Sequence, residues 1–243
     1  VILILGLTSL EIRATRAGLQ RWQATETLVE HMIRLAPGAA PLENDYGAAL
    51  MRNGRFDEAI PYLIRALEAD PRFHVAHYNL AVALTRQNRV PEAIRHYELA
   101  IQIKSDYVDA LNNLGVILQQ AGRGDEAIAC YRKAIASRRE SYAAYCNLAD
   151  ALAAANRSEE AVEQYREALK INPDLAEAYC NMAPELIKLG RFSEAVEAAK
   201  RALVLRPDYA NAHYNLAVGL QNLKNTAEAV THLNQAIRLK PDL

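Results

Sequence analysis

The sequence has few cysteines and no motif built on them. Cys130, Cys146 and Cys180 are too few and too far apart for a disulfide framework, and none belongs to a CxxC pair. Cys146 and Cys180 lie 34 residues apart, at the same place in a repeat described below. We interpret them as small packing or groove residues rather than redox or metal-binding groups. Cysteine usage therefore leaves the cellular compartment open.

An excess of either charge is also absent. The 243 residues include 28 Lys or Arg and 29 Asp or Glu, so the formal net charge is -1. A nucleic-acid-binding protein usually carries a basic surface, and an acidic disordered tail has the opposite excess. The composition is that of an ordinary soluble protein, and we expect no nucleic-acid partner.

Catalytic and metal-binding motifs are missing as well. The sequence has no phosphate-cradling glycine loop, no nucleophile elbow and no HExxH motif. His74 and His77 can share a helix face, but no further ligands accompany them at a matching spacing. Acidic pairs such as Asp57-Glu58 occur where helices are predicted to begin, and negative charge there complements the helix dipole. We predict a protein that is not an enzyme, without a metal or cofactor.

The amino end has an apolar run that is too short to cross a membrane. The first ten residues, VILILGLTSL, carry no charge, but a span needs about 20. A signal peptide has its positive charge before the apolar run, whereas Arg13, Arg16 and Arg21 follow it. Two interpretations stay open: a membrane span completed by upstream sequence, or one flank of a capping helix.

From about residue 40 to the end, the sequence repeats every 34 residues without an insertion. The clearest marker is a turn followed by a helix start, at residues 54, 88, 122, 156, 190 and 224: GRFDEAI, NRVPEAI, GRGDEAI, NRSEEAV, GRFSEAV and KNTAEAV. Apolar residues recur at helical spacing, and no alternating strand pattern occurs. The sequence therefore predicts an all-α array with two helices in each repeat.

Small residues mark the points where the two helices approach closely. In the first helix they are Gly47, Ala81, Gly115, Ala149, Ala183 and Ala217. In the second helix they are Ala59, Ala93, Ala127, Ala161, Ala195 and Ala229, and seven residues later Ala66, Ala100, Ala134, Ala168, Ala202 and Ala236. Leu80, Leu114, Leu148, Met182 and Leu216 are expected to fill the space beside them.

Glycine, asparagine and proline mark the predicted helix ends. Gly or Asn at 54, 88, 122, 156 and 190 is expected to stop each first helix in a left-handed turn. Proline at 71, 173, 207 and 241 is expected to stop the second helix. Where Ser105 and Arg139 replace this proline, we expect the helix to run slightly further. Pro184 lies inside a first helix, where it removes one backbone hydrogen bond and should cause a kink.

These features closely resemble the tetratricopeptide repeat family, whose fold is a right-handed superhelical solenoid of antiparallel helix pairs. The resemblance covers residues 40–243 as six repeats: 40–73, 74–107, 108–141, 142–175, 176–209 and 210–243. Residues 1–39 are predicted to hold membrane-proximal or capping helices with a half repeat. Because no solvating helix follows the sixth repeat, its end is expected to be cut, or covered by a partner or a second copy.

The resemblance implies that the first helices line a concave groove. Positions 2, 6, 9 and 13 of each repeat share the helix face that points into it. Position 6 holds Asp45 in the first repeat and asparagine in the next five. An amide offers a donor and an acceptor, so this row can pair with the backbone of an extended peptide, as in the similar repeats of the O-linked N-acetylglucosamine transferases. Alternatively, the asparagines bond locally between helices.

Other groove residues are candidates for selectivity. Arg52, Arg86 and Lys188 offer positive charge, Asp109, Asp150 and Glu177 offer negative charge, and two tyrosines offer aromatic contact. The predicted peptide-binding residues are Asn79, Asn113, Asn147, Asn181, Asn215, Arg52, Arg86, Tyr78, Tyr214 and Lys188.

Two functions follow from these patterns. The first is a non-catalytic scaffold that binds an extended peptide or protein segment in its concave groove. The second is the carboxy-terminal recognition domain of a membrane-bound glycosyltransferase. This alternative rests on residues 1–40, because an apolar run, a basic stretch and the segment RWQATETLVEHMIRLAP look like the junction in bacterial enzymes of that class. A cytoplasmic, membrane-associated or periplasmic location stays open, as does self-association through the termini.

Overall fold

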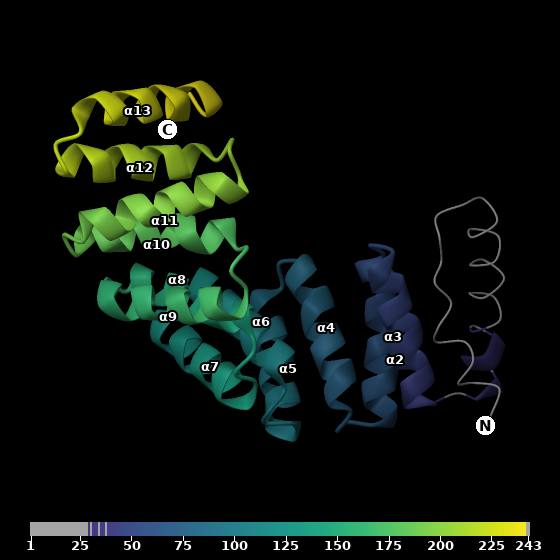
Figure 1. Ribbon diagram of the computed structural model, residues 1–243. Coiled ribbons are helices and arrows are strands. Elements are labelled where there is room, and N and C mark those ends of the chain that lie inside the picture. Colours follow the sequence, from purple (N-terminus) through teal and green to yellow (C-terminus); the bar gives the residue numbers. More distant parts are fainter. Residues whose placement is uncertain (1–28, 30, 34, 37, 242–243) are drawn as a thin grey trace. The chain divides into compact units, whose positions relative to one another are not determined.

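The computed structural model describes residues 29, 31–33, 35–36 and 38–241 (Figure 1). Between residues 40 and 241 the chain forms six helix pairs, and the described residues include no strand, which confirms the all-α prediction. The first helices are α2 (Ala40–Arg52), α4 (His74–Arg86), α6 (Val108–Gln120), α8 (Tyr142–Ala154), α10 (Ala176–Lys188) and α12 (Ala210–Asn222). The second helices are α3 (Phe56–Ala69), α5 (Val90–Ile103), α7 (Gly124–Ser137), α9 (Ser158–Ile171), α11 (Phe192–Leu205) and α13 (Thr226–Leu239).

The chain divides into two compact units, Val1–Ile103 and Lys104–Leu243. In unit 1, α2 packs against α3 and α4, and α4 packs against α5. Unit 2 contains α6 to α13, and each of its first helices packs against its own second helix and the neighbouring repeats. Helices α10 to α13 form a regular stack in this unit (Figure 1). The same contacts recur because the same residues recur every 34 positions.

The small residues lie where the helices of a pair come closest. Ala81, Ala149 and Ala183 are fully buried, as predicted. In the third repeat the approach is tighter still, since a Cβ atom added to Gly115 would lie 2.5 Å from Cε1 of Tyr131. Tyr131 itself is fully buried in α7. The missing side chain at residue 115 therefore makes room for a tyrosine ring.

The first helices end in left-handed turn residues. Gly54, Asn88, Gly122, Asn156 and Gly190 all have positive φ, which confirms the prediction. In each turn the next residue donates its amide to a carbonyl five residues earlier, as in the 3.0 Å bond from Arg55 to Leu50, a common helix-capping arrangement.

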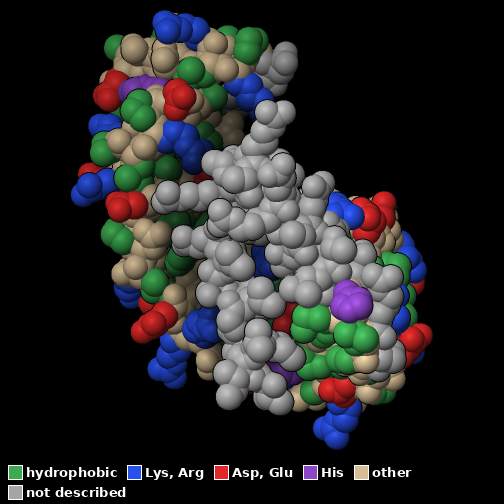
Figure 2. Space-filling view, turned by 90° about the vertical axis from the view of Figure 1, so that its right-hand side faces the viewer, with side chains coloured by type: hydrophobic (Ala, Val, Ile, Leu, Met, Phe, Trp, Pro, Cys, Tyr) green, Lys and Arg blue, Asp and Glu red, His purple; other side chains and the backbone are tan. Residues whose placement is uncertain are grey.

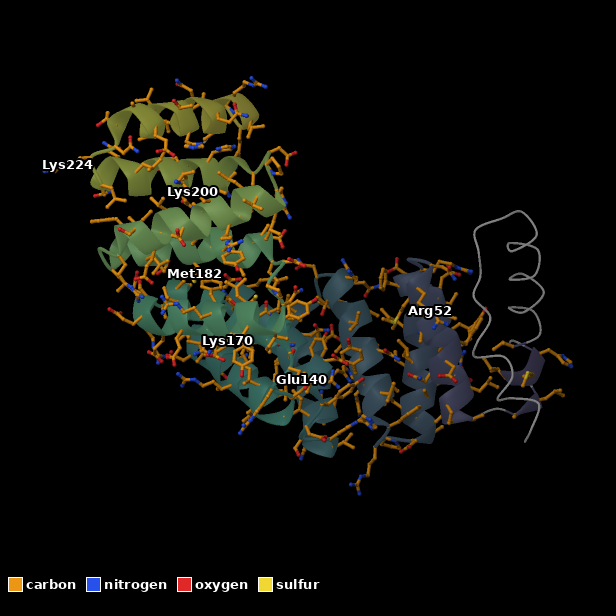
Figure 3. The ribbon with its side chains drawn as sticks, viewed as in Figure 1. Arg52, Glu140, Lys170, Met182, Lys200 and Lys224 are labelled. Carbon is orange, nitrogen blue, oxygen red and sulfur yellow. The ribbon has the colours of Figure 1, made fainter. Side chains whose placement is uncertain are left out.

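The sixth turn has the same conformation without glycine or asparagine. Lys224 adopts φ 64° in the turn between α12 and α13 (Figure 3), and the amide of Asn225 bonds the carbonyl of Leu220 at 2.9 Å. A side chain with a Cβ atom is strained in this region. The repeat architecture therefore imposes the turn even where the residue disfavours it.

The second helices end two residues before the proline position in every repeat. Helices α5 and α7 end at Ile103 and Ser137, which correspond to Ala69 in α3, so the expected extension at Ser105 and Arg139 was wrong. The amide of Tyr107 bonds the carbonyl of Lys104 at 3.1 Å, which closes a turn without proline. The start of the next buried helix therefore determines where the second helix ends, and proline is compatible with this end without being required for it.

Helix α10 runs from Ala176 to Lys188 with Pro184 inside it, over the same 13 residues as the other first helices. Proline has no amide hydrogen, so the carbonyl of Cys180, four residues earlier, loses its usual helical partner. The side-chain amide of Asn215 on α12 donates to this carbonyl at 2.9 Å. The next repeat therefore replaces the missing hydrogen bond.

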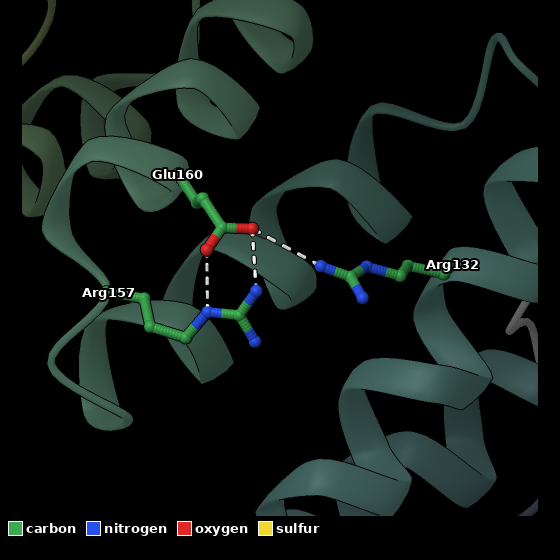
Figure 4. Close-up of polar contacts among 3 residues, drawn as sticks. All are labelled: Arg132, Arg157 and Glu160. Atoms are coloured by element: carbon green, nitrogen blue, oxygen red, sulfur yellow. Dashed lines mark hydrogen bonds and ion pairs between the residues drawn. The ribbon is translucent and has the colours of Figure 1, made fainter.

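Arginine and glutamate link the turns to the second helices. In the fourth repeat, Nε and Nη2 of Arg157 donate to the two carboxylate oxygens of Glu160 at 2.6 and 2.7 Å, while Arg132 on α7 lies 3.3 Å from the same carboxylate (Figure 4). The hydrogen bond from Arg157 lowers the pKa of Glu160. The pairs Arg166–Glu194 and Lys200–Glu228 repeat the link between consecutive second helices of unit 2.

Acidic and basic side chains are interspersed over the C-terminal helices on the face seen in Figure 2. None of the described helices is long and apolar enough to cross a membrane. The predictions made for residues 1–28, including the apolar run and the arginines that follow it, lie outside the described residues.

Candidate functional site

The first helices of unit 2 present one open face and one buried face. Positions 3, 7, 8 and 11 of α6, α8, α10 and α12 are buried without exception. Positions 2, 6, 9 and 13 of these four helices are all half-buried or exposed. We call this second set the first-helix face. Its spacing of 4, 3 and 4 residues places it on one side of each helix, and it carries the predicted asparagines of unit 2 and Lys188.

Four predicted site residues lie in unit 1. Arg52, in the last turn of α2, makes no ion pair with the described residues (Figure 3). The guanidinium of Arg86 lies 5.6 Å from the ring centre of Phe56. Asn79 donates to Oδ1 of Asn44 at 2.9 Å.

The fourth residue of this group is aromatic. The ring of Tyr78 lies edge-on to Tyr97, with 6.0 Å between the ring centres. Tyr97 is almost fully buried in the second helix of the same repeat. Tyr78 therefore has a packing role besides the predicted contact with a peptide.

The other six predicted residues lie in unit 2, and their asparagines are not equivalent. Asn215 donates to the carbonyl of Cys180, as described above, so it has a structural role. Asn181 is exposed and donates to Oδ1 of Asp150 at 3.2 Å. Asn147 is half-buried and makes no hydrogen bond with the described residues. Asn113 lies half-buried at the same position of α6.

A comparison between repeats shows that the amide of Asn147 is free where an equivalent amide is bonded. Asn44 and Asn79, 35 residues apart, are hydrogen-bonded, and the corresponding pair in unit 2 is Asn112 and Asn147. That bond is not formed, and Oδ1 of Asn112 is buried without a donor. Because the side-chain atoms of Asn147 are not buried, they can pair with a ligand.

Lys188 and Tyr214 complete the predicted set. The ammonium of Lys188 lies 2.8 Å from Oε1 of Glu185, a carboxylate that is 4% exposed. The hydroxyl of Ser158, in the preceding repeat, donates to the other oxygen of Glu185 at 2.6 Å. The charge of Lys188 is thus neutralised within the protein. Tyr214, by contrast, is 43% exposed.

Asp150 is the residue whose importance the sequence analysis underestimated. It lies at position 9 of α8, and its Oδ1 accepts hydrogen bonds from the buried hydroxyl of Tyr165 and from Asn181. Burial, together with the charge of Asp150, raises the pKa of Tyr165. The same two causes, in the same order, raise the pKa of Cys146 to about 11, so this thiol stays protonated.

The sequence did contain a signal for Asp150. In the other five repeats position 9 is apolar: Ala48, Val82, Val116, Pro184 and Val218. A carboxylate in an apolar column is an exception that a column-by-column comparison would detect.

The histidines predicted to bind no metal have other partners. Nδ1 of His77 lies 2.9 Å from Nδ1 of His96 on α5, and its Nε2 lies 3.1 Å from the carbonyl of Pro71. Within the described part of the chain, no group of three His, Cys, Asp or Glu side chains is arranged to hold a metal ion.

Solved structures with the same arrangement of helices are numerous. The chain is similar to YrrB, described as a TPR protein with an unusual peptide-binding site, at 23% identity and a TM-score of 0.67, over 74% of this chain and 93% of YrrB. It is similar to PilF from Pseudomonas aeruginosa at 22% identity and a TM-score of 0.72, over 84% of this chain and 93% of PilF. MamA from Desulfovibrio magneticus RS-1 matches at 17% identity and a TM-score of 0.64, over 69% of this chain and 95% of that one.

A search of curated protein sequences gave no match. Family models do match, and both are described as tetratricopeptide repeat: one covers residues 47–108 and 180–243, and the other covers residues 106–174. Proteins with these repeats are generally non-catalytic scaffolds for protein interaction. The repeat period, the helix pairs and these matches agree, and the chain belongs to the tetratricopeptide repeat family.

Proposed function

We propose that this scaffold binds an extended polypeptide segment along the first-helix face of unit 2. The observation that carries the proposal is the accessibility of this face on all four first helices. At position 6 of α8, α10 and α12, side-chain amides keep hydrogen-bonding groups that the fold does not pair. The side-chain carbonyls of Asn147, Asn181 and Asn215 accept no hydrogen bond from the described residues. An extended backbone offers amide donors in a row, which suit such acceptors.

The spacing of the site favours a chain over a small molecule. The asparagines at position 6 recur once per repeat on four successive first helices: Asn113, Asn147, Asn181 and Asn215. A ligand that contacts several of them must therefore be long. No enclosed cavity is needed for such a ligand, because backbone hydrogen bonds supply affinity along its length. The description of YrrB as a TPR protein with a peptide-binding site supports the same class of ligand.

Unit 1 carries predicted residues of its own at the same positions of α2 and α4. Arg52 and Arg86 give these helices a positive charge, in contrast to unit 2. We propose that they contact a bound polypeptide through its acidic side chains.

The test compares two asparagines of the first-helix face with one asparagine elsewhere. Peptides of random sequence are selected on the intact chain, and their affinity is measured by calorimetry for the chain and for the double variant Asn147→Ala, Asn181→Ala. Asn234→Ala, which removes an exposed amide from α13, is the matched control. Two lost hydrogen bonds of about 1 kcal/mol each predict a loss of affinity of at least tenfold.

The expected result is selection of unstructured peptides that bind the chain and the Asn234→Ala variant equally and the double variant weakly. Circular dichroism should show equal helix content in all three proteins. Failure to select any peptide, or equal affinity for the double variant, would reject the proposal and leave the asparagines with a purely local role.

A further inference from the structure

The charges on the first helices of unit 2 are unbalanced once internal pairs are removed. Lys188 is the one Lys or Arg on α6, α8, α10 and α12, and Glu185 neutralises it. Glu177 pairs with Arg206 at 2.7 Å. Asp109 and Asp150 remain, and neither forms an ion pair with a described residue. The first-helix face therefore has two uncompensated carboxylates and no free cation.

Asp150 differs from Asp109 because the protein holds its carboxylate in place. Its Oδ1 is bonded to Tyr165, which is 1% exposed, and to Asn181 on the next first helix. Its Oδ2 has no partner and does not belong to the buried unpaired atoms of the described residues, so it is open to solvent. A carboxylate with one oxygen anchored and the other accessible is prepared for one further strong donor.

The surroundings of Asp150 match the proposed path of a peptide. Asn147 lies three residues earlier on α8, one turn away on the same face, with its amide free. Asn181 contacts Asp150 directly. A bound backbone that pairs with these two amides would pass beside the free oxygen of Asp150, within reach of a long side chain.

The absence of a compensating cation indicates the chemistry of this side chain. A partly desolvated carboxylate gains most from a positively charged hydrogen-bond donor. A metal ion is disfavoured, because the described residues supply no group of three ionisable ligands here. We propose that the segment bound by unit 2 carries a lysine or arginine side chain that pairs with Oδ2 of Asp150. This inference rests on the peptide-binding function proposed above.

The first measurement is the composition of the selected peptides. If the inference is correct, lysine or arginine is enriched at one position relative to the starting library. Replacing that residue by methionine, which keeps the length of the side chain without its charge, should weaken binding roughly tenfold.

The second measurement uses Asp150→Asn, which removes the charge and keeps an oxygen for Tyr165 and Asn181. Glu163→Gln removes a negative charge from an exposed position of α9, outside the first-helix face, and is the matched control. We expect Asp150→Asn to weaken the basic peptide roughly tenfold and to leave the methionine peptide unchanged, whereas Glu163→Gln changes either peptide less than twofold.

The outcomes separate this inference from the function on which it rests. Peptides that bind without enrichment of a basic residue, or a loss that is equal for Glu163→Gln and Asp150→Asn, overturn the inference and leave the peptide-binding function intact. Failure to select peptides at all rejects both. If Asp150→Asn does not fold, the comparison of lysine with methionine and with neutral acetyl-lysine in the peptide still decides the question on the unaltered protein.

Discussion

Gly115 and Tyr131 meet inside the third repeat with no space for one more carbon atom. A Cβ at residue 115 would also lie 2.7 Å from Cζ of this ring. In the fourth repeat the equivalent pair is Ala149 and Tyr165, both buried, so the backbone there accommodates a methyl group. The local packing in each repeat therefore determines whether glycine or alanine fits at this position.

We predict that Gly115→Ala lowers the free energy of unfolding by about 1–3 kcal/mol, because the buried ring must move to relieve the contact. Gly124→Ala is the control, since this glycine is the first residue of α7 and has no atom within 4 Å of the added Cβ. It should be neutral or stabilise the helix by up to about 1 kcal/mol. Urea unfolding followed by circular dichroism gives both values, and equal stability of the two variants would contradict the packing argument.

Helix α10 shows how one element depends on the next. Pro184 leaves the carbonyl of Cys180 without its helical donor, and Asn215 on α12 supplies a replacement. Cys180 is 2% exposed, so water cannot readily take over this role. The asparagine at position 6 therefore has a structural role in the sixth repeat, whereas the asparagine of the fourth repeat has no such role.

We predict that Asn215→Ala costs about 1–2 kcal/mol of stability, because it leaves a buried carbonyl without a donor. In a Pro184→Ala background the restored backbone amide bonds that carbonyl, so the same substitution should cost about 1 kcal/mol less. Asn147→Ala, which removes no hydrogen bond, should change stability by less than about 0.5 kcal/mol. A double-mutant cycle measured by urea unfolding checks the coupling, and equal costs in the two backgrounds would refute it.

At the scale of the whole molecule, two histidine pairs couple stability to pH. His77 pairs with His96 in unit 1, and His213 pairs with His232 in unit 2, each with 2.9 Å between the Nδ1 atoms. Since the carbonyl of Pro71 only accepts, Nε2 of His77 must donate to it, so its Nδ1 accepts from His96. The corresponding carbonyl bonds His213 in the same way. If both rings of a pair were protonated, two N–H donors would face each other at the Nδ1 atoms.

The pKa values of both histidines in the first pair are lowered. Burial, followed by the charges of His77 and Arg95, lowers the pKa of His96 to about 4, although Glu92 opposes the shift. Burial also lowers the pKa of His77, against the carbonyl of Pro71 and the charge of Asp70.

In the second pair, the pKa of His232 is shifted in the same direction. Burial, His213 and Lys200 lower the pKa of His232, against Glu228. As the pH falls below about 6.5, the unfolded chain therefore takes up protons before the folded one does.

We predict that the free energy of unfolding decreases by about 1–2 kcal/mol between pH 6.5 and pH 4.5 through these pairs. The glutamates bonded to arginine, such as Glu160, have lowered pKa values and lose their contribution only at lower pH. Urea unfolding at pH 6.5 and pH 4.5 should show the decrease in the parent and a smaller one in the double variant His96→Gln, His232→Gln. His31→Gln, which removes an exposed histidine, is the control, and an identical decrease in the double variant would exclude the pairs as its cause.

The helix pairs, their packing residues and the first five turns were predictable because each depends on local residues that recur from repeat to repeat. Glycine or asparagine in a left-handed turn, alanine at a close approach and apolar residues at helical spacing have the same meaning in every repeat. The end of α5 at Ile103 was predicted less well, because the expectation relied on proline and ignored the turn that the next repeat imposes.

The sequence alone also identified position 6 as a row of amides on one helix face, and this follows from helical periodicity. Only the tertiary structure distinguished its members, because their partners come from other helices: Cys180 for Asn215, Asp150 for Asn181, and none for Asn147. The pairing of Lys188 with a buried glutamate and the open oxygen of Asp150 were decided in the same way. Periodicity determines which residues share a face, whereas hydrogen bonds between neighbouring helices determine which of them are left for a ligand.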